Sequence, residues 1–322
     1  MNGLATYVHA MGRGPSKGRN LTRAEACDAM TQMLAGTAAP EAVGALLMLM
    51  RYCGETADEL AGFVDALRAD AAQWSTLDVD LDWPCYAAGK SRGWPLFLIA
   101  AQNIAHSGRK VLLHGWNSHQ SQTASIEAGC RALGIAVCND ISDAKSALES
   151  DNIAYVPLRV ISAPALDLVQ KRDVLGLRSP VNTALRAFNP AGAKASVQGV
   201  FHPSYRGLQM DAANALGQTQ LGVVKGAGGE FEVNPTKATE LHLKTAGSEG
   251  VTVIPPIINP PERLADISKD LTELPQAITA QGNVQGVIRS TIALALMVLE
   301  DGLTFDDAFG QAGELMRQKQ DM

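Results

Sequence analysis

The segment CYAAGKSRGWPLFLIAAQ, residues 85–102, holds the first side chains in the chain that could do chemistry. It lies between an apolar run and a helical pattern, where a glycine-rich loop would bind phosphate through backbone N–H groups. Only two glycines are present, and Lys90 and Arg92 supply positive charge instead. Gly89-Lys90-Ser91 matches the tail of a nucleotide-binding P-loop, but Pro84 stands where that motif needs its earlier glycine. The segment therefore indicates anion binding without a P-loop.

Positive charge is concentrated in three segments that contain no Asp or Glu, namely residues 1–24, 83–126 and 174–210. Each of them has four Lys or Arg, although the formal net charge of the chain is −6. If the three segments meet in space, they form a basic cleft on an acidic body. Such a cleft would hold a small anionic ligand or contact nucleic acid through Arg13, Lys17, Arg19, Arg109, Lys110, Arg186 and Arg206.

Individual cations and histidines allow more than one interpretation. Solvated surface charge, a remnant phosphate site and a polyanion groove all explain the set of Lys90, Arg92, Arg109 and Lys110, and the lack of acidic neighbours favours the last two. Arg178 either contacts an anion or stabilises the end of a helix through the macrodipole. Turn or surface positions explain His114 and His119 better than zinc binding, because no carboxylate lies nearby in sequence.

The composition is that of a protein with a sizeable core. The chain has 322 residues, of which 46% are apolar and 19% charged, enough for two domains. No apolar run approaches the roughly 18 residues of a membrane span, and no signal-peptide core is visible. We therefore expect a cytoplasmic protein that does not cross a membrane. The five cysteines form no Cys-x-x-Cys pair, which predicts reduced core residues without a disulfide framework or a zinc site.

Helical signals dominate the start of the chain. Two capping boxes, Thr22-x-x-Glu25 and Thr56-x-x-Glu59, predict helix starts. Between them the segment PEAVGALLMLMRYCGE begins with a proline and is apolar almost all round, which predicts a central helix. We expect a helical domain over residues 1–72.

Short apolar runs alternate with helical patterns in the rest of the chain. The candidate strands are KVLLHG, IAYVPL, SVQGVF, LGVVKG and VTVIPP, separated by stretches long enough for crossover helices. This alternation predicts an α/β domain over residues 80–322 with a mostly parallel central sheet. A helical segment at about residues 163–190 would return to the first domain, which makes the helical domain small and discontinuous.

The order of these segments resembles that of a known family. The helical start, then GRKVLLHG, LGLRSPVNTALRAFNPAGA and GVFHPSY, match segments of the anthranilate phosphoribosyltransferases in the right order. That glycosyltransferase family shares its fold with the pyrimidine nucleoside phosphorylases. The resemblance implies a helical domain beside an α/β domain, a homodimer, and a phosphate-bearing ribose donor bound in the cleft between the domains.

The donor and metal motifs of that family are altered in this chain. Where the family has Gly-Thr-Gly-Gly-Asp-Gly, residues 85–90 are CYAAGK, and PLFL stands in place of Asn-x-Ser-Thr. The Asp-Glu pair that holds magnesium falls on EFEV, so only Glu232 remains as a metal ligand, beside an apolar Phe231. No cofactor is therefore expected, unless phosphoribosyl pyrophosphate binds and brings magnesium with it.

Other residues of the family pattern are present. Arg178 matches the arginine that faces the carboxylate of the aromatic acid, a role that uses its planar fork of donors. His114, Asn117 and Ser118 match the His-Gly-Asn-Arg-Ser turn, with one extra residue at Trp116. The resemblance thus implies a substrate or anion site made by Lys90, Arg92, His114, Asn117, Ser118 and Arg178.

One branch of the family fits these departures more closely. A second, degenerate bacterial branch keeps the fold and the dimer, has altered donor motifs, and is proposed to bind nucleic acid. MGRGPSKGRNLTR, HPSYRG and GEFEVNP resemble that branch. Three functions remain open: a transferase with impaired standard activity, a non-enzymatic homodimer that binds nucleic acid through a basic cleft, and a regulatory or scaffolding protein. The pattern does not decide whether the chain is an enzyme.

Overall fold

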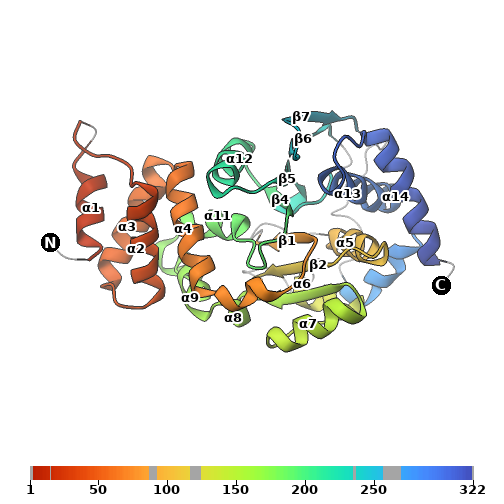
Figure 1. Ribbon diagram of the computed structural model, residues 1–322, viewed down its shortest axis with the longest axis horizontal. Coiled ribbons are helices and arrows are strands. Elements are labelled where there is room, and N and C mark those ends of the chain that lie inside the picture. Colours follow the sequence, from red (N-terminus) through yellow and green to blue (C-terminus); the bar gives the residue numbers. More distant parts are fainter. Residues whose placement is uncertain are drawn as a thin grey trace.

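The computed structural model describes residues 3–14, 16–86, 93–116, 125–234, 237–256 and 270–320. The first part of the chain is helical (Figure 1), and its elements are α1 (Ala5–Gly12), α2 (Arg23–Leu34), α3 (Pro40–Cys53), α4 (Ala57–Asp70) and the short 3-10 helix η1 (Ala72–Thr76). Both predicted capping boxes form: the Thr22 hydroxyl accepts the N–H of Glu25, and the Thr56 hydroxyl that of Glu59. These contacts satisfy backbone donors that a helix start leaves free.

A seven-stranded sheet forms the centre of the second part, in the order β3-β2-β1-β4-β5-β6-β7 (Figure 1). Neighbouring strands from β3 to β5 pair in parallel, whereas β6 pairs antiparallel with both β5 and β7. The strands are β1 (Leu81–Cys85), β2 (Val111–Gly115), β3 (Ile153–Pro157), β4 (Ala195–Val200), β5 (Gln220–Lys225), β6 (Thr239–Lys244) and β7 (Glu249–Ile254). The predicted fold class, a helical domain with a mostly parallel α/β domain, is confirmed.

Helices cover both faces of this sheet. One face packs against α5, α6, α13 and α14, and the other against α7, α11 and the helical part of the chain. The remaining elements are α5 (Phe97–His106), α6 (Ile126–Ala132), α7 (Ile141–Ser150), α8 (Leu158–Ile161), α9 (Ala163–Gln170), α10 (Arg172–Leu175), α11 (Pro180–Ala184), η3 (Leu185–Ala187), α12 (Tyr205–Leu216), η4 (Ala227–Gly229), η6 (Leu271–Ile278), α13 (Asn283–Leu299) and α14 (Phe305–Gln320).

The helical part is fastened to the α/β part by packing and by hydrogen bonds. Helix α9 packs against α2, and both α11 and α12 pack against α4. Arg68 of α4 donates to the carbonyl of Phe188 at 2.8 Å, and Arg23 of α2 donates to the carbonyl of Ala215 at 2.6 Å. The expected domain bounds, 1–72 and 80–322, stay a prediction.

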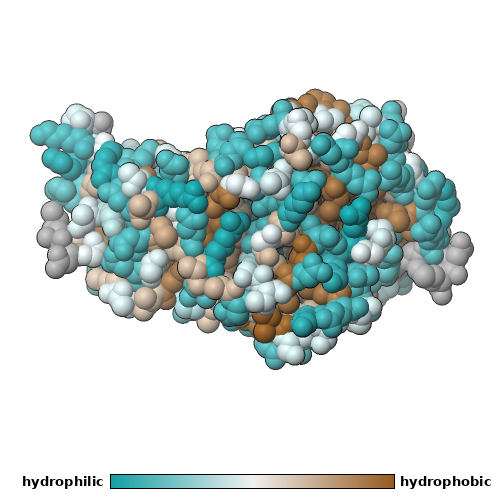
Figure 2. All heavy atoms as spheres, viewed as in Figure 1, coloured by the Kyte–Doolittle hydropathy of each residue, from teal (hydrophilic) through white to brown (hydrophobic). Residues whose placement is uncertain are grey.

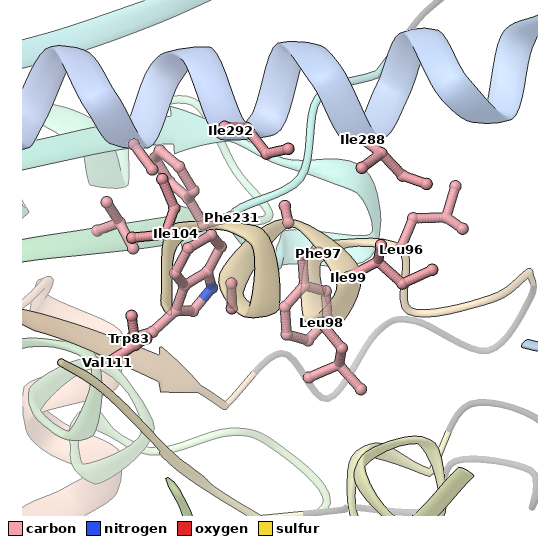
Figure 3. Packing of buried hydrophobic residues seen from close by; sticks show 14 of the residues in the cluster. Trp83, Leu96, Phe97, Leu98, Ile99, Ile104, Val111, Phe231, Ile288 and Ile292 are labelled. Atoms are coloured by element: carbon pink, nitrogen blue, oxygen red, sulfur yellow. The ribbon is translucent and has the colours of Figure 1, made fainter. Parts of the chain in front are cut away.

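Hydrophobic contacts hold α5 between the sheet and α13. Phe97 of α5 stacks on Trp83 of β1 with ring centroids 6.3 Å apart, and Ile288 and Ile292 of α13 lie above the helix (Figure 3). All four side chains are buried. The start of α5 is therefore held in place by the core beside the carboxyl end of β1.

The far edge of the sheet differs from its centre. Strand β7 exposes Val251 by 54% and Val253 by 61%, and Figure 2 shows hydrophobic atoms at this end of a largely hydrophilic face. Among the described residues, no single helix has the length and hydropathy needed to cross a membrane, although η6 and α13, bent by 76°, pass that test as a pair.

Candidate anion-binding site

A cavity of about 310 Å³ lies where α3 meets the carboxyl end of β4. Its wall comes from Arg51 at the end of α3, from the segment 172–186 around α10 and α11, and from residues after β4 at the start of α12. The carboxyl ends of parallel strands are where α/β proteins bind ligands. This cavity is therefore the candidate site within the part of the chain that the structure describes.

Two arginines of the cavity wall have no counter-charge. Arg178 follows α10, which ends at Gly176 in the left-handed conformation with φ 72°. Its guanidinium makes no hydrogen bond or ion pair with a described protein group. Arg172 on α10 has a buried Nη1 that is also without a hydrogen-bond partner. Burial lowers the pKa of Arg178, and the positive charges of Arg172 and Arg51 lower it further. The cavity thus has uncompensated positive charge, and the predicted anion contact at Arg178 stays a prediction.

A third arginine links the two parts of the chain across the cavity. Arg51 of α3 donates to the hydroxyl of Tyr205 on α12, and that hydroxyl donates to Glu55 at 3.2 Å. The Glu55 carboxylate also lies 3.9 Å from Arg51 Nη1. Burial raises the pKa of Glu55, an effect that the charge of Arg51 opposes. Arg51 and Tyr205 line this side of the cavity, and Glu55 contacts both of them.

Arg186 lines the cavity, but its guanidinium donates hydrogen bonds to buried backbone carbonyls. Its Nε donates to the carbonyl of Gly199 at 2.9 Å, Nη1 to the carbonyl of Asn182 at 2.8 Å, and Nη2 to the carbonyl of Tyr86 at 3.2 Å. Burial lowers the pKa of Arg186 to about 10, and the nearby charge of Glu230 counteracts the shift. These bonds join the ends of β1, β4 and α11, and the expected nucleic-acid contact at Arg186 stays a prediction.

One buried amide of the cavity wall has an acceptor without a hydrogen-bond partner. Gln209 of α12 lines the wall and is 0% exposed. Its Nε2 donates to the carbonyl of Thr183 at 3.0 Å, which fixes the orientation of the amide because a carbonyl can only accept. Its Oε1 is buried and has no hydrogen-bond partner.

His114 does not line the cavity. Its Nε2 lies 2.9 Å from Asp82 Oδ1, and its Nδ1 lies 2.9 Å from the hydroxyl of Tyr86. Ser196 donates to the other oxygen of Asp82 at 2.7 Å. All four residues are buried. The network joins β1, β2 and β4 beneath the site, so His114 positions the strands, and its expected anion contact stays a prediction.

The expected metal ligand Glu232 has a different partner. Its carboxylate accepts the backbone N–H of Phe97, the first residue of α5, at 3.0 Å. Phe231 beside it is buried and meets Trp83 edge-on, with centroids 5.5 Å apart (Figure 3). In the described ranges, no three or more His, Cys, Asp or Glu side chains are grouped so that they could hold a metal ion.

Comparisons with known proteins identify the family. A model of the glycosyl transferase family, helical bundle domain, matches residues 13–71. An anthranilate phosphoribosyltransferase of Bacillus caldotenax is 30% identical over 227 residues, which cover 70% of this chain and 93% of the relative. This chain belongs to the anthranilate phosphoribosyltransferase family. The anthranilate phosphoribosyltransferase of Geobacillus kaustophilus is 28% identical over 94% of the chain, and that of Methylocella silvestris is 30% identical, with 64% of the relative covered.

Solved structures show the same fold. The anthranilate phosphoribosyltransferase of Thermus thermophilus matches 98% of this chain and 94% of its own with a TM-score of 0.81, at 20% identity. The enzyme of Saccharomyces cerevisiae in complex with PRPP and Mg matches with a TM-score of 0.79, at 14% identity. The degenerate branch that the sequence favoured is not supported by these matches.

The sequence also predicted other Lys and Arg residues at a basic cleft. In the structure, these residues do not lie together. Arg109 and Lys110 directly precede β2, at the amino end of that strand, whereas the cavity lies at the carboxyl end of β4; they pair with Glu300 at 3.3 Å and Asp78 at 2.7 Å, respectively. Others pair locally or stand alone: Arg19 with Glu25, Arg206 with Glu240, and Arg13 and Lys17 exposed in the loop after α1. A single basic cleft from the three acid-free segments is therefore not present among the described residues.

Four predicted site residues, Lys90, Arg92, Asn117 and Ser118, lie outside the described residues. Conversely, sequence reasoning missed Arg51, Arg172, Tyr205 and Gln209, which all line the cavity. Arg172 could have been found from its place six residues before Arg178. The others had no usable signal, because Arg51 and Tyr205 meet only when two helices from distant parts of the chain come together.

Proposed function

We propose that this chain is an anthranilate phosphoribosyltransferase-like protein whose standard reaction is impaired, while its arginine cavity still binds an anionic acid. The observation that carries the proposal is the contact between the Glu232 carboxylate and the Phe97 N–H. Phe97 begins α5, and the family resemblance places donor phosphate at this helix start. The N-terminus of a helix attracts negative charge, and here a buried carboxylate of the protein supplies it.

A donor phosphate would have to share the start of α5 with this carboxylate or displace it. Two like charges about 4 Å apart repel by about 4 kcal/mol at an effective dielectric constant of about 20. That energy corresponds to a loss of about a thousandfold in affinity. The loop sequence adds to this effect, because Tyr86, Ala87 and Ala88 stand where the family has Thr-Gly-Gly.

The residues present do not fit the magnesium site of the family. A paired carboxylate site would need an acidic side chain at residue 231, where Phe231 packs in the core against Trp83 (Figure 3). The Glu232 carboxylate is turned to the backbone of α5. Magnesium prefers one or two carboxylates together with the phosphates of its substrate, and here one position of the pair is apolar while the carboxylate at the other accepts the Phe97 N–H.

The arginines of the cavity support binding of the acid substrate and do not themselves supply a catalytic group. Arg178 and Arg172 would hold and orient an acid by charge-assisted hydrogen bonds. The reaction typical of the family is displacement at the anomeric carbon of a ribose donor. Positioning and charge stabilisation promote such a displacement without a covalent nucleophile, so a chain that orients the acid but holds the donor poorly should turn over slowly.

A steady-state assay of anthranilate phosphoribosylation tests the proposal. The assay would supply anthranilate, phosphoribosyl pyrophosphate and Mg²⁺, with the relative from Geobacillus kaustophilus as the comparator. We expect the rate of this chain to be at least about 100-fold lower, because each lost electrostatic contact to a reacting group typically costs about 10²–10³ in rate. Magnesium-dependent turnover comparable to that of the relative would overturn the proposal.

We also propose that the chain forms a homodimer through α3, by an isologous contact. Tyr52 in the last turn of α3 is 90% exposed, and a symmetric contact at this helix would cover it. Light scattering at micromolar concentration should give twice the chain mass, and the mass of one chain would contradict the dimer. The nucleic-acid alternative stays a prediction, which an oligonucleotide titration at two salt concentrations would test.

A further inference from the structure

The charges around the cavity do not balance. Of its four arginines, Arg51 lies 3.9 Å from the carboxylate of Glu55, and Arg186 has the nearby charge of Glu230. Arg172 and Arg178 have no ion pair with any described carboxylate. Two positive charges therefore remain without a partner on one wall of a partly enclosed space.

Unpaired charges of this kind are costly unless a ligand neutralises them. A buried donor without a hydrogen-bond partner costs free energy, and Arg172 Nη1 is such a donor. Burial lowers the pKa of Arg178, and the positive charge of Arg172 lowers it further because the two guanidinium groups repel each other. Their planar forks match the oxygens of carboxylates and phosphates. A ligand with one negative charge would leave one of the two arginines uncompensated.

The rest of the wall adds an apolar surface. Leu177 and Phe201 line the cavity, and both side chains are partly exposed there, at 58% and 46%. The aromatic face of Phe201 and the aliphatic side chain of Leu177 offer an apolar surface on which a ring can pack. The cavity, about 310 Å³, is at the lower end of the range for small-molecule sites.

We propose that this cavity binds a small aromatic acid that carries two negative charges, through Arg172 and Arg178. The inference rests on the proposed function, because it names the class of acid that the same site takes. The dianion is either a pair of neighbouring carboxylates or a phosphate ester on the ring. In both cases one negative charge is available for each of the two guanidinium groups. Anthranilate has a single carboxylate and therefore only one such charge.

Isothermal titration with four probes tests the charge requirement without donor or metal. The probes are benzoate, anthranilate, phthalate and phenyl phosphate at constant ionic strength. We expect phthalate or phenyl phosphate, whichever represents the natural chemistry, to bind at least about tenfold more tightly than benzoate, since a second charge-assisted contact is added. Equal affinities for all four probes would overturn the proposal. Inorganic phosphate that binds as tightly as phenyl phosphate would overturn the role of the ring.

Variants assign the two charges to their residues. Arg172→Gln should reduce the affinity for the preferred dianion at least about tenfold and leave benzoate within about threefold. Arg131→Gln is the matched control, because that exposed arginine on α6 pairs with Glu127 and does not line the cavity. Thermal melting of each variant checks that it is folded. If Arg172→Gln is folded and binds the dianion like the wild type, the proposal is wrong.

These outcomes are separate from those of the proposed function. The titrations use neither phosphoribosyl pyrophosphate nor Mg²⁺, so they report only on the acid site. Fast anthranilate turnover with tight dianion binding would refute the impaired donor site and keep the dianion site. Slow turnover with no preference for dianions would do the reverse.

Discussion

Replacing Arg186 by leucine should destabilise the fold although the residue lines the ligand cavity. In the native protein its guanidinium donates to the carbonyls of Gly199, Asn182 and Tyr86, at 2.9, 2.8 and 3.2 Å. Leucine fills part of the volume but leaves these buried acceptors without their donor, at about 1–3 kcal/mol each. It also removes a positive charge near the buried Glu230.

The net loss is smaller than the sum of these contributions. Arg186 itself loses hydration on burial, which the fall of its pKa to about 10 reflects, and leucine avoids that cost. Removing one member of a buried charged network typically costs about 3–5 kcal/mol, and we expect a value near the lower end. At a urea m-value of about 3 kcal/mol/M or slightly more, the unfolding midpoint should fall by about 1 M.

Arg178→Gln is the matched control for this experiment. Arg178 lines the same cavity but makes no hydrogen bond with a described protein group. Its removal relieves repulsion from Arg172 and Arg51, so stability should change by less than about 1 kcal/mol or rise slightly. Equal destabilisation by the two substitutions would refute the assignment of one arginine to the fold and the other to the ligand.

Other properties follow from particular side chains. A hydrogen bond from Arg19 lowers the pKa of Glu25 from 4.5 to about 2; this pair therefore stabilises the fold above the ordinary pKa and loses that effect as pH falls toward 2. An NMR titration of Arg19→Gln should show the pKa of Glu25 raised toward its ordinary value, although hydrogen bonds from Thr22 still lower it, and an unchanged value would contradict the pairing. Thiol labelling of the native protein should modify the exposed Cys53 rapidly and Cys130 only after unfolding, because burial raises the pKa of Cys130; rapid native labelling of Cys130 would refute its burial. Glu232→Ala should lower the free energy of unfolding by about 2 kcal/mol, since the Phe97 N–H loses a charged acceptor, and an unchanged urea midpoint would show that this contact contributes nothing.

Local signals predicted much of the fold. Both capping boxes begin helices as expected, because the contacts are made within one turn. All five candidate strands are strands. Strand β1 is not among the candidates because Asp82 interrupts its apolar run, and that aspartate is satisfied only by Ser196 and His114 from neighbouring strands. Strand β6 was missed because its charged residues hid the alternation of TELHLK.

The site was harder to predict because tertiary contacts determine which charged side chains are paired in the interior and which face the cavity. In the sequence, Arg178 and Arg186 are two similar cations in one acid-free segment. The structure turns one toward buried carbonyls and leaves the other in the cavity. Likewise, Lys110 lies in an acid-free segment but forms an ion pair with Asp78, which precedes the first strand of the sheet. An absence of acidic neighbours along the chain therefore does not predict a basic surface.

Titration of phosphoribosyl pyrophosphate with Mg²⁺ into the wild-type chain tests whether the donor site is impaired. The Glu232 carboxylate accepts the N–H at the start of α5, and Phe231 is apolar where the metal site of the family needs a carboxylate. We therefore expect a dissociation constant of about 1 mM or weaker, a loss of about a thousandfold from micromolar binding. Micromolar binding that depends on Mg²⁺ would show that the donor site is intact.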